Sequence, residues 1–281
     1  MPWAKLHYMT WPLVTVITPV FNGGVLLRET IESVLRQTYA SIEYIVVDGN
    51  SSDDTLTVVH SFGGGVSEVI SEPDSGMYDA LAKGLLRASG EIICYINAGD
   101  FLHPHAVQVA VDVLKDPSHS WITGCRSVCN EKGESTHVDL PFRYKRSLIR
   151  AGSYARALPG IQQESTFWRA SLLASLDMQF LRTLKLAGDY YLWWSFSQQA
   201  ELEVVSSSLG VFKKHRGQMS EGLDRYLEEV ESFAGKRGIL TRISESYERV
   251  FWSMHPSLRA RFVETVIRFN HQSGIWEKKW R

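Results

Sequence analysis

The chain has 281 residues, of which 44% are hydrophobic and 22% are charged, a composition typical of a folded globular protein. Its formal net charge is −1, which gives no overall field to attract nucleic acid, so we expect no nucleic-acid partner. The length suits one large domain with an appendage, or two small domains.

The cysteines and the hydrophobic segments indicate in which cellular compartment the protein lies. Cys94, Cys125 and Cys129 cannot all pair with one another, and this usage favours a reducing compartment over a disulfide scaffold. Residues 1–11 carry polar and charged side chains where a secretory signal needs an apolar core. No apolar run reaches the roughly 18 residues of a transmembrane helix. We therefore expect a cytoplasmic protein, which can also lie peripherally at the inner face of the cell membrane.

The first half alternates between β-branched or apolar runs and amphipathic segments. Strands are predicted at 13–18, 42–48, 68–71 and 91–96, and helices at 26–35, after residue 54, at 77–88 and at 104–115. This alternation is the pattern of a right-handed parallel α/β sheet. In such sheets ligands bind beyond the carboxyl ends of the strands. Asp48 and Asp100 end or follow two of these strands, so we expect both at the ligand-binding edge.

The second half is mixed. Strands are predicted at 121–128, 136–138 and 202–211, and helices at 172–176, 190–196, 223–233 and 239–269, the last with a break near Pro256. We therefore expect a main domain over 1–220 and a C-terminal helical extension over 221–281. Residues 276–281 mix tryptophan with basic residues, which suits peripheral membrane contact. Packing of the extension on the domain or on a second subunit is the alternative, and no oligomeric state is predicted.

Seven short motifs follow one another along the chain. They are TPVFN at 18–22, VDGNSSDDT at 47–55, EPDSGMYDA at 72–80, NAGD at 97–100, QESTFWR at 163–169, AGDY at 187–190 and HRGQMS at 215–220. Together they resemble family 2 glycosyltransferases with the GT-A fold, in a bacterial subgroup that makes polysaccharide or lipopolysaccharide. The resemblance implies a mostly parallel, Rossmann-like sheet flanked by helices. It also implies a nucleotide-binding half near 12–115 and an acceptor half near 116–220.

The resemblance assigns the donor, a nucleotide-diphosphate sugar, to the first half. It implies that the carboxylate of Asp48 accepts a hydrogen bond from the base, with UDP as the expected nucleotide. It also implies that the backbone of Thr18, Pro19 and Val20 contacts the base. A buried polar pair distinguishes bases because an unpaired group is costly. The alternative is that Asp48 only starts a turn with Gly49.

Further residues are assigned to the nucleotide-sugar site. Asp79 and Lys83 lie one helical turn apart, and the resemblance places their segment beside the nucleotide; a surface ion pair between them is the alternative. Asn97, Glu164 and Arg216 are also assigned to this site. Paired carboxylates can instead indicate a glycoside hydrolase, but a hydrolase needs none of the nucleotide motifs.

Asp100 matches the last carboxylate of the family's metal-binding Asp-x-Asp region. Cations such as Mn²⁺ or Mg²⁺ prefer oxygen ligands and bridge phosphates. This chain departs from the common pattern, because Asn97 and Gly99 stand where carboxylates are frequent. The resemblance suggests His215 as a second metal ligand; the alternative is a solvated basic stretch around it.

Asp189 precedes a segment of large apolar residues, where it can cap a helix. The resemblance gives it a second role, as the general base that takes the proton of the acceptor hydroxyl. The implied function is an inverting transfer of a sugar to a hydroxyl of a growing glycan or lipid-linked saccharide. A degenerate nucleotide-sugar-binding or scaffold protein with an impaired metal site is the alternative. A nucleotidyltransferase or dehydrogenase on a similar α/β sheet is disfavoured, because neither G-x-G-x-x-G nor G-x-x-x-x-G-K-[ST] occurs.

Overall fold

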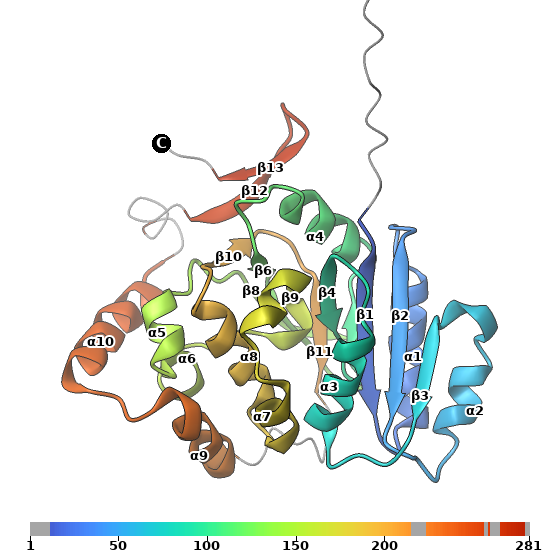
Figure 1. The fold of residues 1–281 in the computed structure, drawn as a ribbon. Coiled ribbons are helices and arrows are strands. Elements are labelled where there is room, and N and C mark those ends of the chain that lie inside the picture. The colour runs from blue at the N-terminus through green and yellow to red at the C-terminus, as the bar shows by residue number, and fades with distance from the viewer. Residues whose placement is uncertain (1–11, 215–222, 256–257, 259–264, 279–281) are drawn as a thin grey trace, which may run out of the picture.

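The computed structural model describes residues 12–214, 223–255, 258 and 265–278. A twisted sheet runs through the molecule, with helices on both of its faces (Figure 1). The strands of this main sheet are β1 (Val14–Val20), β2 (Ile42–Asp48), β3 (Glu68–Ser71), β4 (Ile92–Tyr95), β6 (Trp121–Thr123), β9 (Thr166–Arg169), β10 (Leu202–Val205), β12 (Val266–Asn270) and β13 (Ile275–Lys278). Their order is β13-β12-β10-β6-β9-β4-β1-β2-β3.

Most neighbouring strands of the main sheet are parallel. Among the described residues, β9 is antiparallel to both β4 and β6, and β13 is antiparallel to β12 at the edge. The helices are α1 (Gly24–Leu35), α2 (Thr55–His60), α3 (Met77–Arg87), α4 (Ala106–Leu114), α5 (Arg146–Arg150), α6 (Ser153–Arg156), α7 (Met178–Thr183), α8 (Gly188–Ser197), α9 (Leu223–Ala234) and α10 (Ile239–Ser253), with short 3₁₀ segments η1 (Gly63–Gly65), η2 (Gln163–Ser165) and η3 (Ala170–Ser175).

The two faces of the main sheet carry separate hydrophobic cores, because successive side chains of a strand point to opposite faces. On one face Ile17 and Tyr95 belong to a cluster with residues of α3 and α8. On the other face Val16 and Cys94 belong to a cluster with residues of α1 and α4. Every residue of β1 is buried, as expected for a strand covered on both sides.

A smaller sheet lies beside the carboxyl end of β4. Its strands are β5 (Phe101–Leu102), β11 (Gly210–Lys213), β7 (Arg126–Cys129) and β8 (Ser135–Asp139), which lie in that order. β11 pairs antiparallel with β5 and parallel with β7. Because β5 directly follows Asp100 in the chain, this sheet fixes the loop that carries that carboxylate.

The predicted α/β fold class is confirmed, and every strand predicted in the first half is present. Two predicted strands are each divided between the two sheets. The segment predicted at 121–128 turns at Gly124, whose backbone N–H donates to Ser165, and the segment predicted at 202–211 is interrupted between β10 and β11. The apolar residues of these two segments predicted strands correctly, but they gave no sign that each segment passes from one sheet to the other.

Helix α10 ends at Ser253, close to the predicted break near Pro256. The prediction of a helix up to residue 269 is wrong at its end, because residues 266–269 lie in a strand. The chain returns to the main sheet as β12, where Val266 and Ile267 are buried and pair with β10. These two β-branched residues suit a strand covered on both sides. Trp276 packs against the adjoining core, which agrees with packing of the tail on the domain. The predicted boundary at 220 and residues 279–281 lie outside the described residues.

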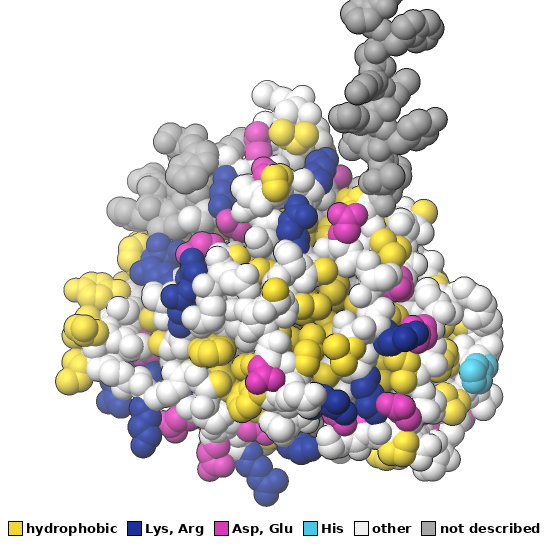
Figure 2. Space-filling view, viewed as in Figure 1, with side chains coloured by type: hydrophobic (Ala, Val, Ile, Leu, Met, Phe, Trp, Pro, Cys, Tyr) yellow, Lys and Arg dark blue, Asp and Glu magenta, His cyan; other side chains and the backbone are white. Residues whose placement is uncertain are grey.

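Helices α9 and α10 lie together at one end of the molecule (Figure 1). Figure 2 shows hydrophobic side chains on the surface at this end. No helix in the described part of the chain is both long and apolar enough to cross a membrane.

Candidate functional site

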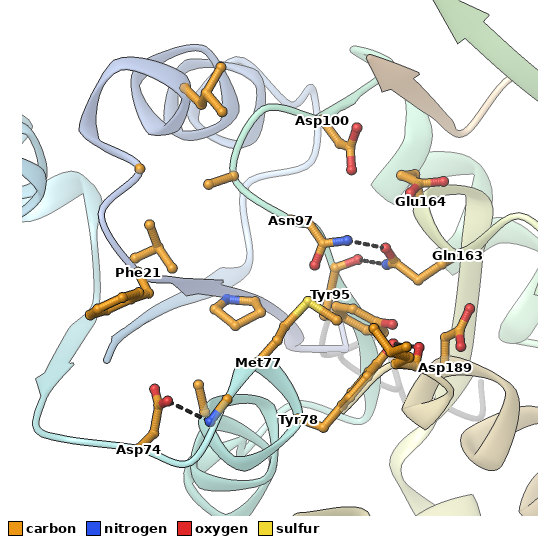
Figure 3. A pocket seen from close by; sticks show the side chains of 18 of the residues that line it. Phe21, Asp74, Met77, Tyr78, Tyr95, Asn97, Asp100, Gln163, Glu164 and Asp189 are labelled. Atoms are coloured by element: carbon orange, nitrogen blue, oxygen red, sulfur yellow. Dashed lines mark hydrogen bonds between the residues drawn. The ribbon is translucent and has the colours of Figure 1, made fainter. Parts of the chain in front are cut away.

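A cavity of about 790 Å³ opens at the carboxyl ends of β1 and β4. Its walls come from the β1–α1 loop, the β3–α3 loop, the start of α3, the β4–β5 loop, η2, the start of α8, β11 and α9. Figure 3 shows side chains from these segments facing one space. Sheets of this class bind ligands at this edge, so the cavity is the candidate site.

Among the carboxyl groups that line the cavity are those of Asp100, Glu164 and Asp189. The structure thus brings together three residues that the sequence analysis assigned to the site. Asp100 is only 4% exposed and accepts a hydrogen bond of 2.9 Å from the backbone N–H of Lys213. Burial and then the charge of Glu164 raise the pKa of Asp100 well above its usual range. Burial likewise raises the pKa of Glu164. Two adjacent buried carboxyl groups require a proton or a cation between them.

A chain of amide groups fixes the orientation of Asn97. The backbone carbonyl of Tyr95 accepts from Nε2 of Gln163, and Oε1 of Gln163 then accepts from Nδ2 of Asn97 at 3.1 Å. A carbonyl oxygen only accepts, so each amide has one orientation that satisfies both bonds. Oδ1 of Asn97 is left buried with no hydrogen-bond partner. Such an atom is suited to a ligand that supplies a donor or a positive charge.

The oxygen atoms around Asp100 fit a hard divalent cation. They belong to the carboxylates of Asp100 and Glu164 and to the unpaired side-chain amide of Asn97. Mg²⁺ and Mn²⁺ prefer oxygen ligands of these types. Within the described ranges no group of three His, Cys, Asp or Glu side chains is arranged to hold a metal. For a metal ion bound here, the phosphates of the donor and water must therefore supply the remaining coordination positions. The predicted ligand His215 and the predicted diphosphate contact Arg216 lie outside the described residues.

Asp189 lies in the first turn of α8. The N-cap residue of this helix is Ala187, and no side chain caps it, so the alternative of a simple N-cap for Asp189 is wrong. Oδ1 of Asp189 accepts from the backbone N–H of Tyr190 at 2.6 Å, and the Tyr226 hydroxyl lies 3.5 Å away. Burial, with a smaller contribution from the charge of Glu164, raises the pKa of Asp189 to about 7. A carboxyl with this pKa can take up a proton near neutral pH.

The turn before Asp189 is held by a carboxylate from the C-terminal segment. Glu229 of α9 accepts from the backbone N–H groups of Lys185 and Leu186 at 2.9 Å and of Ala187 at 2.8 Å. These N–H groups at the start of α8 have no partner within the helix, and a negative charge there is favourable. Glu229 thus helps to fix the direction in which α8 presents Asp189.

Gly188 explains why the helix start can approach α3. A Cβ atom at this position would lie 2.3 Å from the Tyr78 ring. The Tyr78 hydroxyl donates to the carbonyl of Leu186 at 3.0 Å. The motif at 187–190 therefore combines a glycine that admits Tyr78 with an aspartate that faces the cavity.

The three residues expected to contact the base of the nucleotide differ in where their side chains lie. Pro19 and Val20 line the cavity, and Phe21 beside them is 64% exposed at its wall. Thr18 is buried, and its hydroxyl lies 3.0 Å from the hydroxyl of Tyr44. The Thr18 side chain is therefore part of the core, whereas the two residues after it reach the site.

Asp48 is fully buried and does not line the cavity. Its carboxylate accepts from the Ser71 hydroxyl at 2.7 Å and from the backbone N–H of Ser51 at 3.2 Å. These bonds hold the Asp48 carboxylate at the end of β2, and both its contact with a base and the turn alternative stay predictions. Asp74, which the sequence analysis did not assign, does line the cavity. A Cβ on Gly49 would lie 2.5 Å from its carboxylate, so glycine leaves room for Asp74.

Asp79 and Lys83 do not form the alternative ion pair with each other. Asp79 pairs with Arg182 of α7 at 2.6 Å, and Lys83 pairs with Glu72 at 2.9 Å. Lys83 also donates to the carbonyl of Pro73. Both side chains hold the β3–α3 loop, and neither lines the cavity. Their contact with a nucleotide stays a prediction.

Several site residues had no signal in the sequence. Leu223 and Tyr226 of α9 line the cavity together with Tyr95 of β4. The first two lie far along the chain in a segment that reads as an ordinary amphipathic helix. Tyr95 lies in an apolar run that reads as a buried strand. Only the fold brings them to one space.

Comparisons with known proteins agree with this geometry. Residues 15–172 match the family model described as glycosyl transferase family 2. An uncharacterized glycosyltransferase of Rickettsia typhi is 29% identical over 224 residues, which are 79% of this chain and 70% of the relative. An uncharacterized glycosyltransferase of Mycobacterium tuberculosis is 33% identical over 177 residues, which are 60% of this chain and 64% of that relative.

Solved structures show a similar fold. S. aureus TarS 1-349 in complex with UDP-GlcNAc superposes with a TM-score of 0.61 at 16% identity, over 79% of this chain and 65% of that one. A larger TarS structure has a TM-score of 0.63 at 16% identity, over 89% of this chain but only 45% of that one. Glucosyl-3-phosphoglycerate synthase from M. tuberculosis, with Mn²⁺, UDP and phosphoglyceric acid, has a TM-score of 0.54 at 18% identity, over 81% of this chain and 80% of that one.

Proposed function

Since the chain belongs to glycosyl transferase family 2, and is thus a glycosyltransferase that uses a nucleotide sugar, we propose that it transfers the sugar with inversion to a hydroxyl of a growing glycan or lipid-linked saccharide. The observation that carries this proposal is the buried carboxyl of Asp189, with a pKa of about 7, in the same cavity as Asp100 and Glu164. We further propose UDP as the nucleotide. The UDP complexes of two structures with this fold support that choice.

In the proposed reaction Asp189 accepts the proton of the acceptor hydroxyl as that oxygen attacks the anomeric carbon. The bond from this carbon to the phosphate oxygen breaks, and the nucleoside diphosphate leaves. A single displacement of this kind inverts the anomeric centre. Asp100, Glu164 and Oδ1 of Asn97 would hold a Mn²⁺ or Mg²⁺ ion, which when bound offsets the negative charge of the diphosphate. The cavity walls position donor and acceptor, so catalysis rests mainly on positioning and electrostatics.

The remaining assignments are proposals of the same kind. The segment 18–20 and Asp48 would contact the base, Asp79 and Lys83 would hold the adjoining loop beside the nucleotide, and His215 with Arg216 would contact the diphosphate. We retain a glycosyltransferase domain over 1–220 with an extension over 221–281, whose α9 completes the cavity. The described cysteines are all free thiols, which supports the cytosol as the proposed compartment.

The decisive experiment is an assay of donor turnover. The chain is incubated with UDP-, GDP- and dTDP-sugars, with and without Mn²⁺, and the released nucleoside diphosphate is measured. We expect one nucleotide sugar to be hydrolysed slowly in the presence of metal, and faster when a saccharide acceptor is added. Donor binding without hydrolysis or transfer would instead support the degenerate scaffold.

The pH dependence of transfer should report the ionisation of Asp189. The base acts when deprotonated, so a pKa of about 7 predicts a rate that rises by about tenfold per pH unit below this value and is constant above it. The groups that face Asp189 are Glu164 from η2, Tyr78 from α3, Tyr95 from β4 and Tyr226 from α9.

The measurement is the transfer rate at saturating donor between pH 5 and pH 9. This range extends about two pH units to either side of neutrality, where a histidine or a carboxyl with a raised pKa titrates. Circular dichroism at each pH serves as the control for folding. A rate that stays constant from pH 5 upward would contradict the assignment.

Replacing Glu229 should impair the presentation of Asp189. Glu229→Ala leaves three N–H groups without their acceptor, and we expect a loss of stability of about 1–3 kcal/mol. We also expect kcat of transfer to fall by about tenfold or more, with the affinity for the diphosphate unchanged. Glu229→Gln, which retains one acceptor oxygen, should recover part of kcat.

The matched control is Glu228→Ala, an exposed glutamate on the same helix, which should change neither quantity. Thermal unfolding and steady-state kinetics give both readouts. A Glu229→Ala protein with lower stability but unaltered kcat would show that Glu229 stabilises the fold without positioning Asp189.

A further inference from the structure

Helix α10 presents a hydrophobic face to solvent. Its exposed apolar residues are Ile239 (79% exposed), Leu240 (80%), Ile243 (48%), Tyr247 (67%) and Val250 (61%). Their spacing along the helix places them on one side. Figure 2 shows this side as a group of hydrophobic side chains at the left edge of the molecule, where Figure 1 places α10. A contiguous apolar surface of this kind marks an interaction site.

The opposite, polar face of α10 is directed into the protein. Glu248 is fully buried and pairs with Arg143 and Lys145. Glu245 is 4% exposed and pairs with Arg237 at 3.2 Å. Turning the helix to hide its apolar face would leave these buried charges without partners, which is strongly unfavourable. The ion pairs therefore fix α10 with its apolar face outward.

The exposed side of α10 is also positively charged. The only two acidic residues of this helix are the buried pair just described, whereas its two basic residues, Arg242 and Arg249, are exposed. Helical geometry places both arginines beside the apolar stripe, on the same border. The partner that fits is apolar inside and negatively charged at its boundary. A second copy of this face fits less well, because it would bring arginines against arginines.

We propose that α10 binds the surface of a membrane that contains anionic lipids, lying in the plane of the interface with its apolar face among the acyl chains. Helix α9 connects this surface to the site: Leu223 and Tyr226 line the cavity, and α10 begins a few residues after α9 ends. Membrane binding would bring a lipid-linked acceptor close to the cavity, and this consequence rests on the proposed function. The binding of α10 to the membrane is itself independent of that function.

The test is flotation of the full chain with vesicles of phosphatidylcholine, alone or mixed with phosphatidylglycerol. We expect binding to the anionic vesicles that weakens with added salt. The double substitution Leu240→Gln and Ile243→Gln should reduce the partition coefficient by at least about tenfold. Arg242→Gln should reduce it by about fivefold, and on anionic vesicles only.

Matched controls come from exposed apolar residues elsewhere. Leu86 on α3 and Val138 on β8 are 65% and 58% exposed, and their replacement by glutamine should leave vesicle binding unchanged. Equal unfolding temperatures of all variants would confirm that the fold is retained. No donor is present in this assay, so its result is independent of the proposed transfer reaction.

Two results would overturn the proposal. One is a chain that binds neither kind of vesicle, or binds both equally with and without the double substitution. The other is concentration-dependent dimerisation in sedimentation that the double substitution abolishes, with no vesicle binding, which would assign the face to a second copy.

Discussion

The Asp189→Asn protein is expected to transfer sugar about 10²–10⁴-fold more slowly than the unaltered chain. Asparagine has the same shape as aspartate and can still accept from the backbone N–H of Tyr190. It cannot take up the proton of an acceptor hydroxyl. Because the nucleotide-binding residues are assigned to other segments, we expect the diphosphate to bind with unchanged affinity. The effect should therefore fall on kcat.

This prediction is checked by single-turnover kinetics and by thermal unfolding with the diphosphate. A matched control is Asp177→Asn, because Asp177 also begins a helix, where its carboxylate accepts from Gln179 and Phe180, and it does not line the cavity. The control should transfer sugar normally. Near-normal transfer by the Asp189 variant would remove this residue from the mechanism.

The second large effect is expected from Asp100→Ala. At about 100 times its dissociation constant, a ligand that binds only the folded chain raises stability by about 2.7 kcal/mol. We expect one of UDP, GDP and dTDP to produce such a rise with Mn²⁺ and a much smaller one without it. Loss of Asp100 should abolish the difference between the two conditions, because the cation loses a buried carboxylate.

Asp100→Asn is the companion variant, since its amide oxygen can still accept from Lys213 and so separates folding from metal binding. Asp112→Ala is the control, because Asp112 of α4 pairs with Lys115 and does not line the cavity. A metal-dependent rise that survives both substitutions at Asp100 would place the cation on other ligands.

Local sequence patterns were sufficient for the first half of the fold. The strands at 42–48 and 68–71 have the predicted bounds, because a β-branched run followed by a polar loop has few other solutions. The same logic placed Asp100 at the edge of the sheet. Its meeting with Glu164 and Asp189 in one cavity was implied by the order of the motifs and not by any single one.

The contacts that the sequence did not indicate join distant segments. The partner of Asp79 is Arg182, 103 residues away, and a nearby lysine was the only partner that helical spacing could suggest. Glu229 reaches Ala187 from a helix that looked like an appendage. Strand β9 enters the sheet antiparallel between β4 and β6. None of these contacts produces a repeating pattern of residues in the sequence, because each forms only in the completed fold.

The return of the chain to the main sheet as β12 bears on how the protein folds. β10 pairs with β6 on one side and with β12 on the other, so one side of β10 stays unpaired until residues 266–267 have been synthesised. An unpaired strand edge is a template for association with other chains. Long-range parallel pairing is also slow to form. A chain that folds during its synthesis would therefore expose this edge of β10 until the last part of the sheet has been made.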